Sequence, residues 1–141
     1  MKRIYPLCVI FFIALLPGCS KDILKSYDKR IIGTWQITTV RNFGIGGNTD
    51  NLPFNNGSFT FYENGSLDYV NTANTTFRGS WQIIKKIRND KTVHSLQITA
   101  VDFTNQQVLS QYYDDINFTG TNHFKADINF NFHVYVTHFR R

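Results

Sequence analysis

The sequence predicts an all-β domain, and the simplest such fold is a small up-and-down antiparallel β-barrel of about eight strands. Apolar and polar residues alternate with a period of two along several short segments, as in strands that bury one face. Turn-forming residues separate these segments, and no long segment has a helical period. Aromatic residues make up 16% of the chain, and Thr and Asn are abundant, which is a β-forming composition. Sequential hairpins of this kind close into a barrel or pack as a sandwich.

The first half of the domain contains a long loop and a tight hairpin. Trp35, Ile37 and Thr39 are expected to share one face of the first strand. A Gly- and Asn-rich loop over Asn42–Asn56 follows it. The next hairpin turns at Glu63–Ser66, where Asn-Gly is typical of a type I′ turn. The alternating segments after the loop are Phe59–Phe61, Leu67–Tyr69 and Phe77–Ile84.

The second half predicts the remaining strands. The polar run Lys85–Lys91 indicates a turn, and its cations either solubilise that turn or contact anionic lipid or polysaccharide. The last alternating stretch, Phe124–Val136, is longer than an ordinary strand, so we expect a break near Asn129 or Asn131. Between these regions lie a strand with Leu96, Ile98 and Ala100 on one face, a turn at Asn105–Gln107, a strand over Val108–Phe118 and a turn at Thr119–Thr121.

The N-terminal region has the pattern of a bacterial lipoprotein signal. Lys2 and Arg3 precede an apolar run, Ile4–Leu16, that is too short to span a bilayer comfortably. Leu16-Pro17-Gly18-Cys19 then matches a lipobox, in which the Cys receives lipid and becomes the new N-terminus. The alternatives are an ordinary secretory signal or a short membrane anchor. We expect a signal peptide over 1–18 and lipid, including palmitate, on Cys19.

Three segments follow from this prediction: the signal peptide, a lipidated tether over 19–30 and one domain over 31–141. Cys8 leaves with the signal peptide, so the mature domain folds without a disulfide. Ile23, Leu24, Tyr27 and Ile31 have helical spacing, which indicates a short helical turn against the domain. The expected location is the outer membrane of the cell envelope, on its periplasmic face or at the cell surface.

Gly33-Thr34-Trp35-Gln36-Ile37 is repeated almost unchanged as Gly79-Ser80-Trp81-Gln82-Ile83. A duplicated half-barrel would explain the repeat. The flanking residues do not match, however, so we interpret it as one local solution used twice. In that solution Gly permits a close approach of the backbone and Trp fills the end of the barrel.

These features resemble the lipocalins, and more closely the lipocalin-like lipoproteins of Bacteroidota. The resemblance rests on the lipobox, on Gly33-Thr34-Trp35, on the hairpin Phe59–Leu67 and on the Arg residues at the end of the sequence. It implies that Gly33 and Trp35 close the narrow end of the barrel with Arg140 or Arg141 over the Trp ring. The Thr-Asp-Tyr motif, the disulfides and the C-terminal helix of classical lipocalins are absent.

An eight-stranded barrel either holds one small ligand or is filled by its own side chains, and the sequence leaves both possibilities open. A small apolar or amphipathic ligand would lie between aromatic side chains, with the loop Asn42–Asn56 as a lid over the open end. The residues assigned to this possible pocket are Phe59, Phe61, Trp81, Phe124, Ile128 and Phe130.

Catalytic residues, metal ligands and cofactors are not expected. Asp114 and Asp115 are adjacent and would point to opposite faces of a strand, which disfavours an acid–base pair. No His is spaced with a carboxylate as metal ligands are. Without Lys2 and Arg3 of the predicted signal peptide the net side-chain charge is about +3, which is too small to indicate nucleic acid. Two functions remain: a lipid-anchored barrel that binds a small apolar ligand, or a filled barrel that binds an envelope protein or has a structural role.

Overall fold

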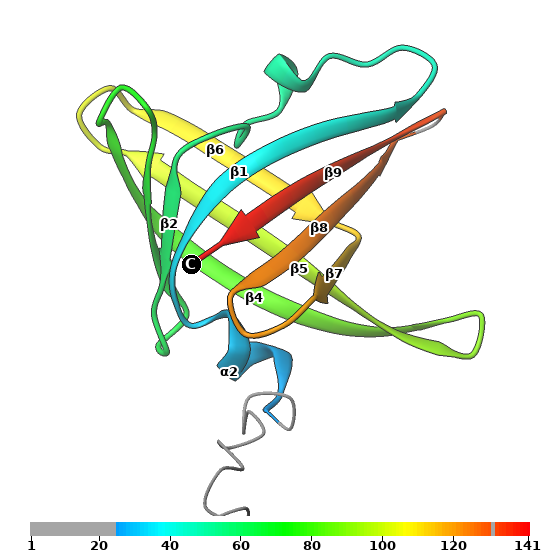
Figure 1. Cartoon of the computed structure of the whole chain (residues 1–141). Coiled ribbons are helices and arrows are strands. Elements are labelled where there is room, and N and C mark those ends of the chain that lie inside the picture. Colours follow the sequence, from blue (N-terminus) through cyan, green and yellow to red (C-terminus); the bar gives the residue numbers. More distant parts are fainter. Residues whose placement is uncertain (1–24, 131) are drawn as a thin grey trace, which may run out of the picture.

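The structure, a computed structural model, describes residues 25–130 and 132–141, and the predicted signal peptide and Cys19 lie outside them. These residues form one short α-helix, one 3-10 turn and nine strands (Figure 1). The elements are α2 (Tyr27–Ile31), β1 (Gly33–Gly44), η2 (Thr49–Asn51), β2 (Ser58–Phe61), β3 (Ser66–Val70), β4 (Thr76–Arg88), β5 (Lys91–Asp102), β6 (Gln107–Tyr113), β7 (Asp115–Phe118), β8 (His123–Phe130) and β9 (His133–Arg140).

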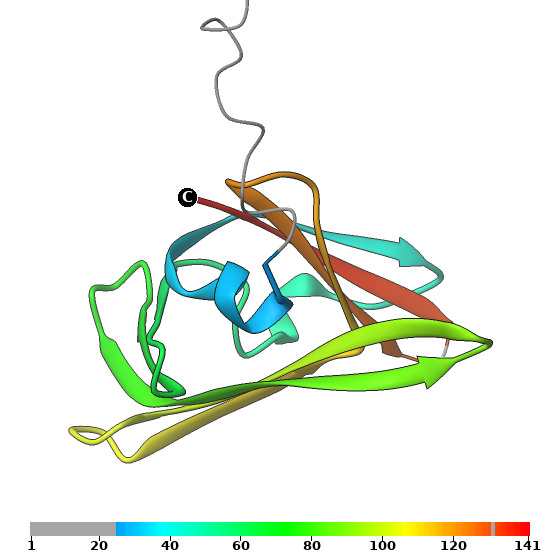
Figure 2. The ribbon, with the colours of Figure 1, turned by 90° about the horizontal axis from the view of Figure 1, so that it is seen from below.

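All nine strands belong to one antiparallel sheet, so the predicted all-β class is confirmed. The strand order is β6-β5-β4-β3-β2-β1-β9-β8-β7, in which consecutive strands are neighbours except β6 and β7, and β9 returns to pair with β1. The sheet curls around a central core, as the view from below shows (Figure 2). Its ladder is not closed, because β6 and β7 are its two ends. The prediction of a closed barrel therefore requires correction to a strongly curled, open sheet.

The two ends of the sheet meet at Asp114, between β6 and β7. β6 pairs with β5 as far as Tyr113, which lies opposite Leu96. β7 then pairs with β8 from Asp115, which lies opposite Asp127. The Asp114 backbone N–H donates to the Asp127 carbonyl (2.7 Å), and its carboxylate accepts from the Asn129 N–H (2.7 Å). The Ser95 hydroxyl donates to the Asp114 carbonyl (2.9 Å). The single strand predicted over Val108–Phe118 is therefore two strands, because this corner changes the pairing partner.

A β-bulge in β1 alters which residues face inward. Trp35 and Ile37 are buried as predicted, but the register with β9 shifts between Ile37 and Thr39. The extra residue reverses the alternation, so Thr39 is exposed and Val40 packs against the core. The prediction that Thr39 shares the face of Trp35 is therefore wrong.

The β4–β5 hairpin is longer than predicted. Pairing continues from Lys85 with His94 to Arg88 with Lys91, so the polar run assigned to a turn is mostly strand. The reversal is confined to Asn89 and Asp90, which both adopt positive φ (50° and 59°) as a two-residue type I′ turn requires. The hairpin extends past the rest of the sheet as a two-stranded ribbon, at the lower right in Figure 1.

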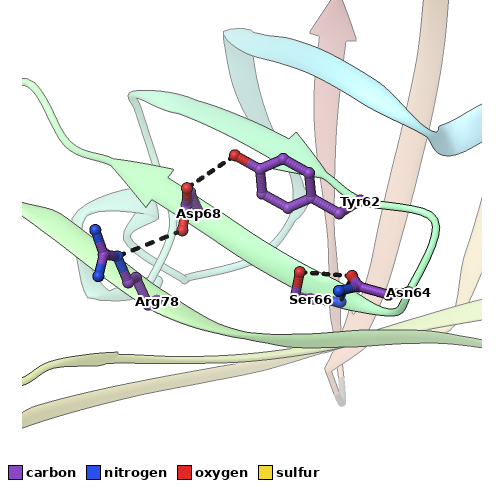
Figure 3. Close-up of polar contacts among 5 residues, drawn as sticks. All are labelled: Tyr62, Asn64, Ser66, Asp68 and Arg78. Carbon is purple, nitrogen blue, oxygen red and sulfur yellow. Dashed lines mark hydrogen bonds and ion pairs between the residues drawn. The ribbon is translucent and has the colours of Figure 1, made fainter.

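The β2–β3 hairpin turns at the predicted place with a different geometry. Only Gly65 has positive φ, and its N–H donates to the Tyr62 carbonyl (3.1 Å), so the turn is type I followed by a left-handed Gly rather than type I′. Asn64 accepts hydrogen bonds from the Ser66 N–H (3.0 Å) and hydroxyl (2.6 Å). On the same hairpin the Tyr62 hydroxyl donates to Asp68 (2.9 Å), which Arg78 of β4 approaches at 3.9 Å (Figure 3).

The final alternating stretch divides as predicted, because β8 ends at Phe130 and β9 begins at His133. Leu96, Ile98 and Ala100 of β5 are all fully buried, as their shared face predicts. No helix in the described part of the chain is long and apolar enough to cross a membrane.

Candidate functional site

One end of the curled sheet is closed by a cluster around Trp35. The indole N–H donates to the Ile31 carbonyl (2.6 Å), which ties α2 to the start of β1. The Arg141 guanidinium carbon lies 4.2 Å from the centroid of the Trp35 ring, and its nitrogen donates to the carbonyls of Arg30 (2.8 Å) and Ile32. Gly33 at the base of β1 has a φ of 119°, a conformation that L side chains rarely adopt. The helix α2, through the Ile31 carbonyl, and Arg141 therefore both contact the indole of Trp35 at the start of β1.

Of the two arginines assigned to this end, only Arg141 lies over the Trp35 ring. Arg140 is the last residue of β9, where it pairs with Gln36 on one side and His123 on the other. Because side chains alternate along a strand, Arg140 points to the exposed outer face, whereas the next residue returns over the closed end. The assignment of Arg140 to the closing cluster is corrected on this ground.

The interior is occupied by stacked and edge-on aromatic rings. Phe124 stacks on Phe139 with centroids 4.2 Å apart and meets Trp35 edge-on at 4.7 Å. Phe59 stacks on Phe61 at 5.7 Å and on Tyr69 at 4.7 Å. These separations are those of rings in direct contact. The four predicted pocket residues that are buried here contact core side chains: Phe59, Phe61, Phe124 and Ile128.

The other two predicted pocket residues lie at the margins. Trp81 is partly buried, meets Phe61 edge-on at 5.7 Å and donates its indole N–H to the Tyr62 carbonyl (3.1 Å). Phe130 is 59% exposed, although it continues the alternation of Phe124 and Ile128. It is the last residue of β8, where burial ends although the alternation continues, so the period of two alone did not predict its exposure. The assignment of Phe130 to an interior pocket is therefore corrected.

The loop after β1 is fastened to the core by Phe54, a residue that the sequence did not single out. Phe54 is 1% exposed and meets Phe59 at 5.2 Å and Tyr69 at 4.9 Å, both edge-on. The Tyr69 hydroxyl donates to the Asn56 carbonyl (2.9 Å). At Gly57 an added Cβ would lie 2.3 Å from the Val70 carbonyl oxygen, so the loop returns in close contact with β3. This loop places a side chain in the interior at the end where the sequence predicted a lid over a ligand.

The buried polar groups of the described residues are phenols and hydroxyls, together with one carboxyl, that of Asp102 at the end of β5. Burial raises the pKa of Tyr113, which has no exposed surface, and burial also raises the pKa of Tyr69. Both phenols therefore stay neutral at physiological pH. Thr137 is also fully buried. In the described residues no group of three or more His, Cys, Asp or Glu side chains could hold a metal ion.

Exposed apolar side chains gather where β1, β8 and β9 end. Gly44 at the end of β1 and Phe130 at the end of β8 both pair with His133, the first residue of β9, so the three strand ends lie side by side (Figure 1, upper right). Ile45 is 89% exposed and Phe132 is 87% exposed. We call the following residues the apolar rim: Phe43, Ile45, Phe130 and Phe132. Phe43 pairs with Val134 and Phe130 pairs with His133, so the rim presents apolar side chains on both faces of the sheet end. The exposure of these residues was not predicted from the sequence, in which the only signal is an apolar residue within or beside a polar turn.

No family model, no curated protein and no solved structure matches this chain. The fold, the filled interior and the apolar rim are therefore the observations from which a function is argued.

Proposed function

We propose that this chain is a lipid-anchored component of the cell envelope, lipocalin-like in its β domain, that binds a protein partner through the apolar rim. In this proposal the interior is structural and carries no small ligand. The anchor is the lipid predicted on Cys19, and the location is the outer membrane. Enzymatic activity is not part of the proposal.

The observation that carries the proposal is the occupation of the interior by the chain's own rings. Phe54 contributes from the loop that would otherwise serve as a lid, and it packs against Phe59 and Tyr69. A ligand of useful size needs a pocket of roughly 300 Å³ or more. Two cavities of that size at the described residues are lined by residues outside the buried ring cluster: one of about 720 Å³ by Thr34, Gln36 and Ser58 among others, and one of about 310 Å³ by Lys29, Arg30 and Arg141 among others. Linings with hydroxyl, amide and cationic side chains do not suit the small apolar ligand that the sequence suggested.

The position of the rim favours a protein partner over the membrane. β1 runs from Gly33, next to α2 and the tether, to Gly44 at the rim. Twelve residues of strand place those ends about 35 Å apart. The rim therefore lies at the end of the strand away from the lipid anchor. Exposed aromatic residues in a cluster are also typical of the centres of protein interfaces.

Photo-crosslinking in the native host tests this proposal. A benzoylphenylalanine at Phe132 is expected to give one discrete product with a different envelope protein. The matched control places the same group at Phe103, which is 76% exposed but lies at the β5–β6 turn. Adding Phe43→Ser and Ile45→Ser should remove the product. No product at Phe132, or equal products at both positions, would overturn the proposal. A crosslink between two copies of this chain would also overturn it, because the partner would then be the chain itself and not a different envelope protein.

A further inference from the structure

Two basic regions lie at the anchored side of the molecule. The first surrounds α2 and includes Lys25, Lys29 and Arg30, with Asp28 as the one acidic residue between residues 25 and 31. The second is the tip of the β4–β5 ribbon, where four cations accompany one acidic residue, Asp90. Those cations are Lys85, Arg88 and Lys91, together with Lys86, whose ammonium donates to the Tyr112 hydroxyl of β6 (2.5 Å). Both regions occupy the lower side of the molecule in Figure 1.

A ring contact joins the two regions. Tyr27 of α2 stacks on His94 of β5 with centroids 3.8 Å apart and planes 8° from parallel. His94 pairs with Lys85, so this contact fixes the root of the ribbon to the helix. From His94 the strand continues to Lys91, a distance of about 10 Å. The ribbon tip is therefore held at a defined distance from the segment that leads to the anchor.

The ribbon tip has features that do not serve the stability of the fold. Arg88 and Lys91 lie directly opposite each other across the two strands, and like charges in this position destabilise a hairpin. Ile87 is 81% exposed beside them, and it lies on the same face as Lys85 and His94, because opposite residues share a face. That is the face on which α2 packs. Lys86, Arg88 and Lys91 lie on the opposite face of the ribbon, so its tip carries cations on both faces and one exposed aliphatic residue. This combination is typical of a surface that contacts a membrane interface.

The length of the tether limits how far this side can be from the membrane. Residues 19–25 connect the predicted lipidated Cys19 to Lys25, and a chain of this length spans at most about 21 Å. The basic residues on this side therefore lie within reach of the lipid surface. They complement anionic headgroups, and each basic residue near such a surface adds about 1 kcal/mol of attraction, or about five-fold in affinity.

We propose that the α2 region and the β4–β5 tip form a second membrane contact, in which their cations bind anionic phospholipid headgroups and Ile87 enters the interface. This inference rests on the anchor in the proposed function and not on the apolar rim. It gives the domain a defined orientation, with the rim directed away from the lipid surface.

Tryptophan quenching in vesicles tests the position of the tip. Cys19 is the only cysteine in residues 19–141, so that chain can be coupled through its thiol to a maleimide lipid, which needs no cellular lipidation. Ile87→Trp is expected to be quenched by brominated lipids in phosphatidylethanolamine–phosphatidylglycerol vesicles, after subtraction of the parent chain. Phe132→Trp on the rim is the matched control and should remain unquenched. No quenching at Ile87→Trp, equal quenching at both positions, or no dependence on phosphatidylglycerol would overturn the contact.

Charge removal tests the chemistry independently. For residues 19–141 with Cys19→Ser, Arg88→Gln with Lys91→Gln should weaken binding to the same vesicles roughly twenty-five-fold, since each basic residue contributes about five-fold. The control, Arg41→Gln with Arg78→Gln, removes the same charge from exposed positions elsewhere. The first variant should melt no lower than the parent, because it removes a like-charge pair. An equal loss in the control would overturn the proposal, and the palmitate experiment below tests the anchor separately.

Discussion

Arg141 lies over the ring of Trp35, with its guanidinium carbon 4.2 Å from the ring centroid, and so connects residues from opposite ends of the domain. The same guanidinium donates to the carbonyls of Arg30 and Ile32, which lead from α2 into β1. One side chain thus satisfies backbone acceptors and covers an aromatic face. This arrangement closes the anchored end of the domain and joins the tether to the sheet.

Arg141→Ala should destabilise the domain by about 1–2 kcal/mol, through loss of the cation–π contact and of two charge-assisted hydrogen bonds. The matched variant Arg140→Ala, on the exposed outer face, should change the free energy of unfolding by less than about 0.5 kcal/mol. Chemical denaturation of both variants measures the difference. Equal effects would show that the Trp35 contact has no special role.

Phe54→Ala should destabilise the domain by about 3–5 kcal/mol, because it removes a buried ring and leaves a cavity. Phe43→Ala is the control, since Phe43 precedes the same loop but is exposed, and it should cost less than about 0.5 kcal/mol. Thermal melting of both variants checks this. A Phe54 variant as stable as the parent would mean that the loop is an unfastened lid.

Asp102 should make the stability depend on pH in the acid range. Hydrogen bonds from the Asn105 side chain (2.6 Å) and the Thr104 N–H (2.9 Å) hold the pKa of this carboxyl below its usual value. Its contribution is therefore present above the unfolded pKa of about 3.9 and is lost as pH falls through the lower folded pKa. Denaturation of Asp102→Asn at pH values above and below this window should show a deficit relative to the parent that disappears in acid. A deficit that persists unchanged would mean that the charge of Asp102 does not contribute.

Cys19→Ala should abolish incorporation of labelled palmitate in the native host, because the thiol is the predicted site of lipid attachment. Cys8→Ala removes the other cysteine and should leave labelling intact. Metabolic labelling followed by immunoprecipitation makes the comparison. Palmitate retained in the Cys19 variant would contradict the lipoprotein prediction.

Local sequence patterns predicted much of the sheet, because strand alternation is a short-range property. Leu96, Ile98 and Ala100 form a buried face as their spacing indicates, and the break after Phe130 follows from strand length. The pairing of β1 with β9 brings distant residues together, and local alternation carries no signal for it. The bulge after Ile37 depends on that distant pairing, so the inward face of Thr39 was predicted wrongly. The corner at Asp114 depends on a change of pairing partner from β5 to β8, which alternation does not encode either, so the single strand over Val108–Phe118 was also predicted wrongly.

The candidate site was predicted less well than the sheet. Trp35 and a terminal arginine were named, but the alternation of β9 turns Phe139 inward and Arg140 outward, so it is Arg141 that lies over the ring. Burial of Phe54 could not be read from a Gly- and Asn-rich loop. Exposure of Phe130 depends on where the opposing strands end, which the alternation of its own strand does not contain.

Native mass spectrometry of the mature protein, purified from its own host in mild detergent, tests most directly whether the interior is filled. The account predicts one species, with the mass of the polypeptide and its covalent lipid and nothing further. A stoichiometric small apolar molecule that is retained by the folded protein and released on denaturation would contradict it. That result would assign the domain to ligand binding, and the aromatic rings around Phe59 would then have to move apart to admit the ligand.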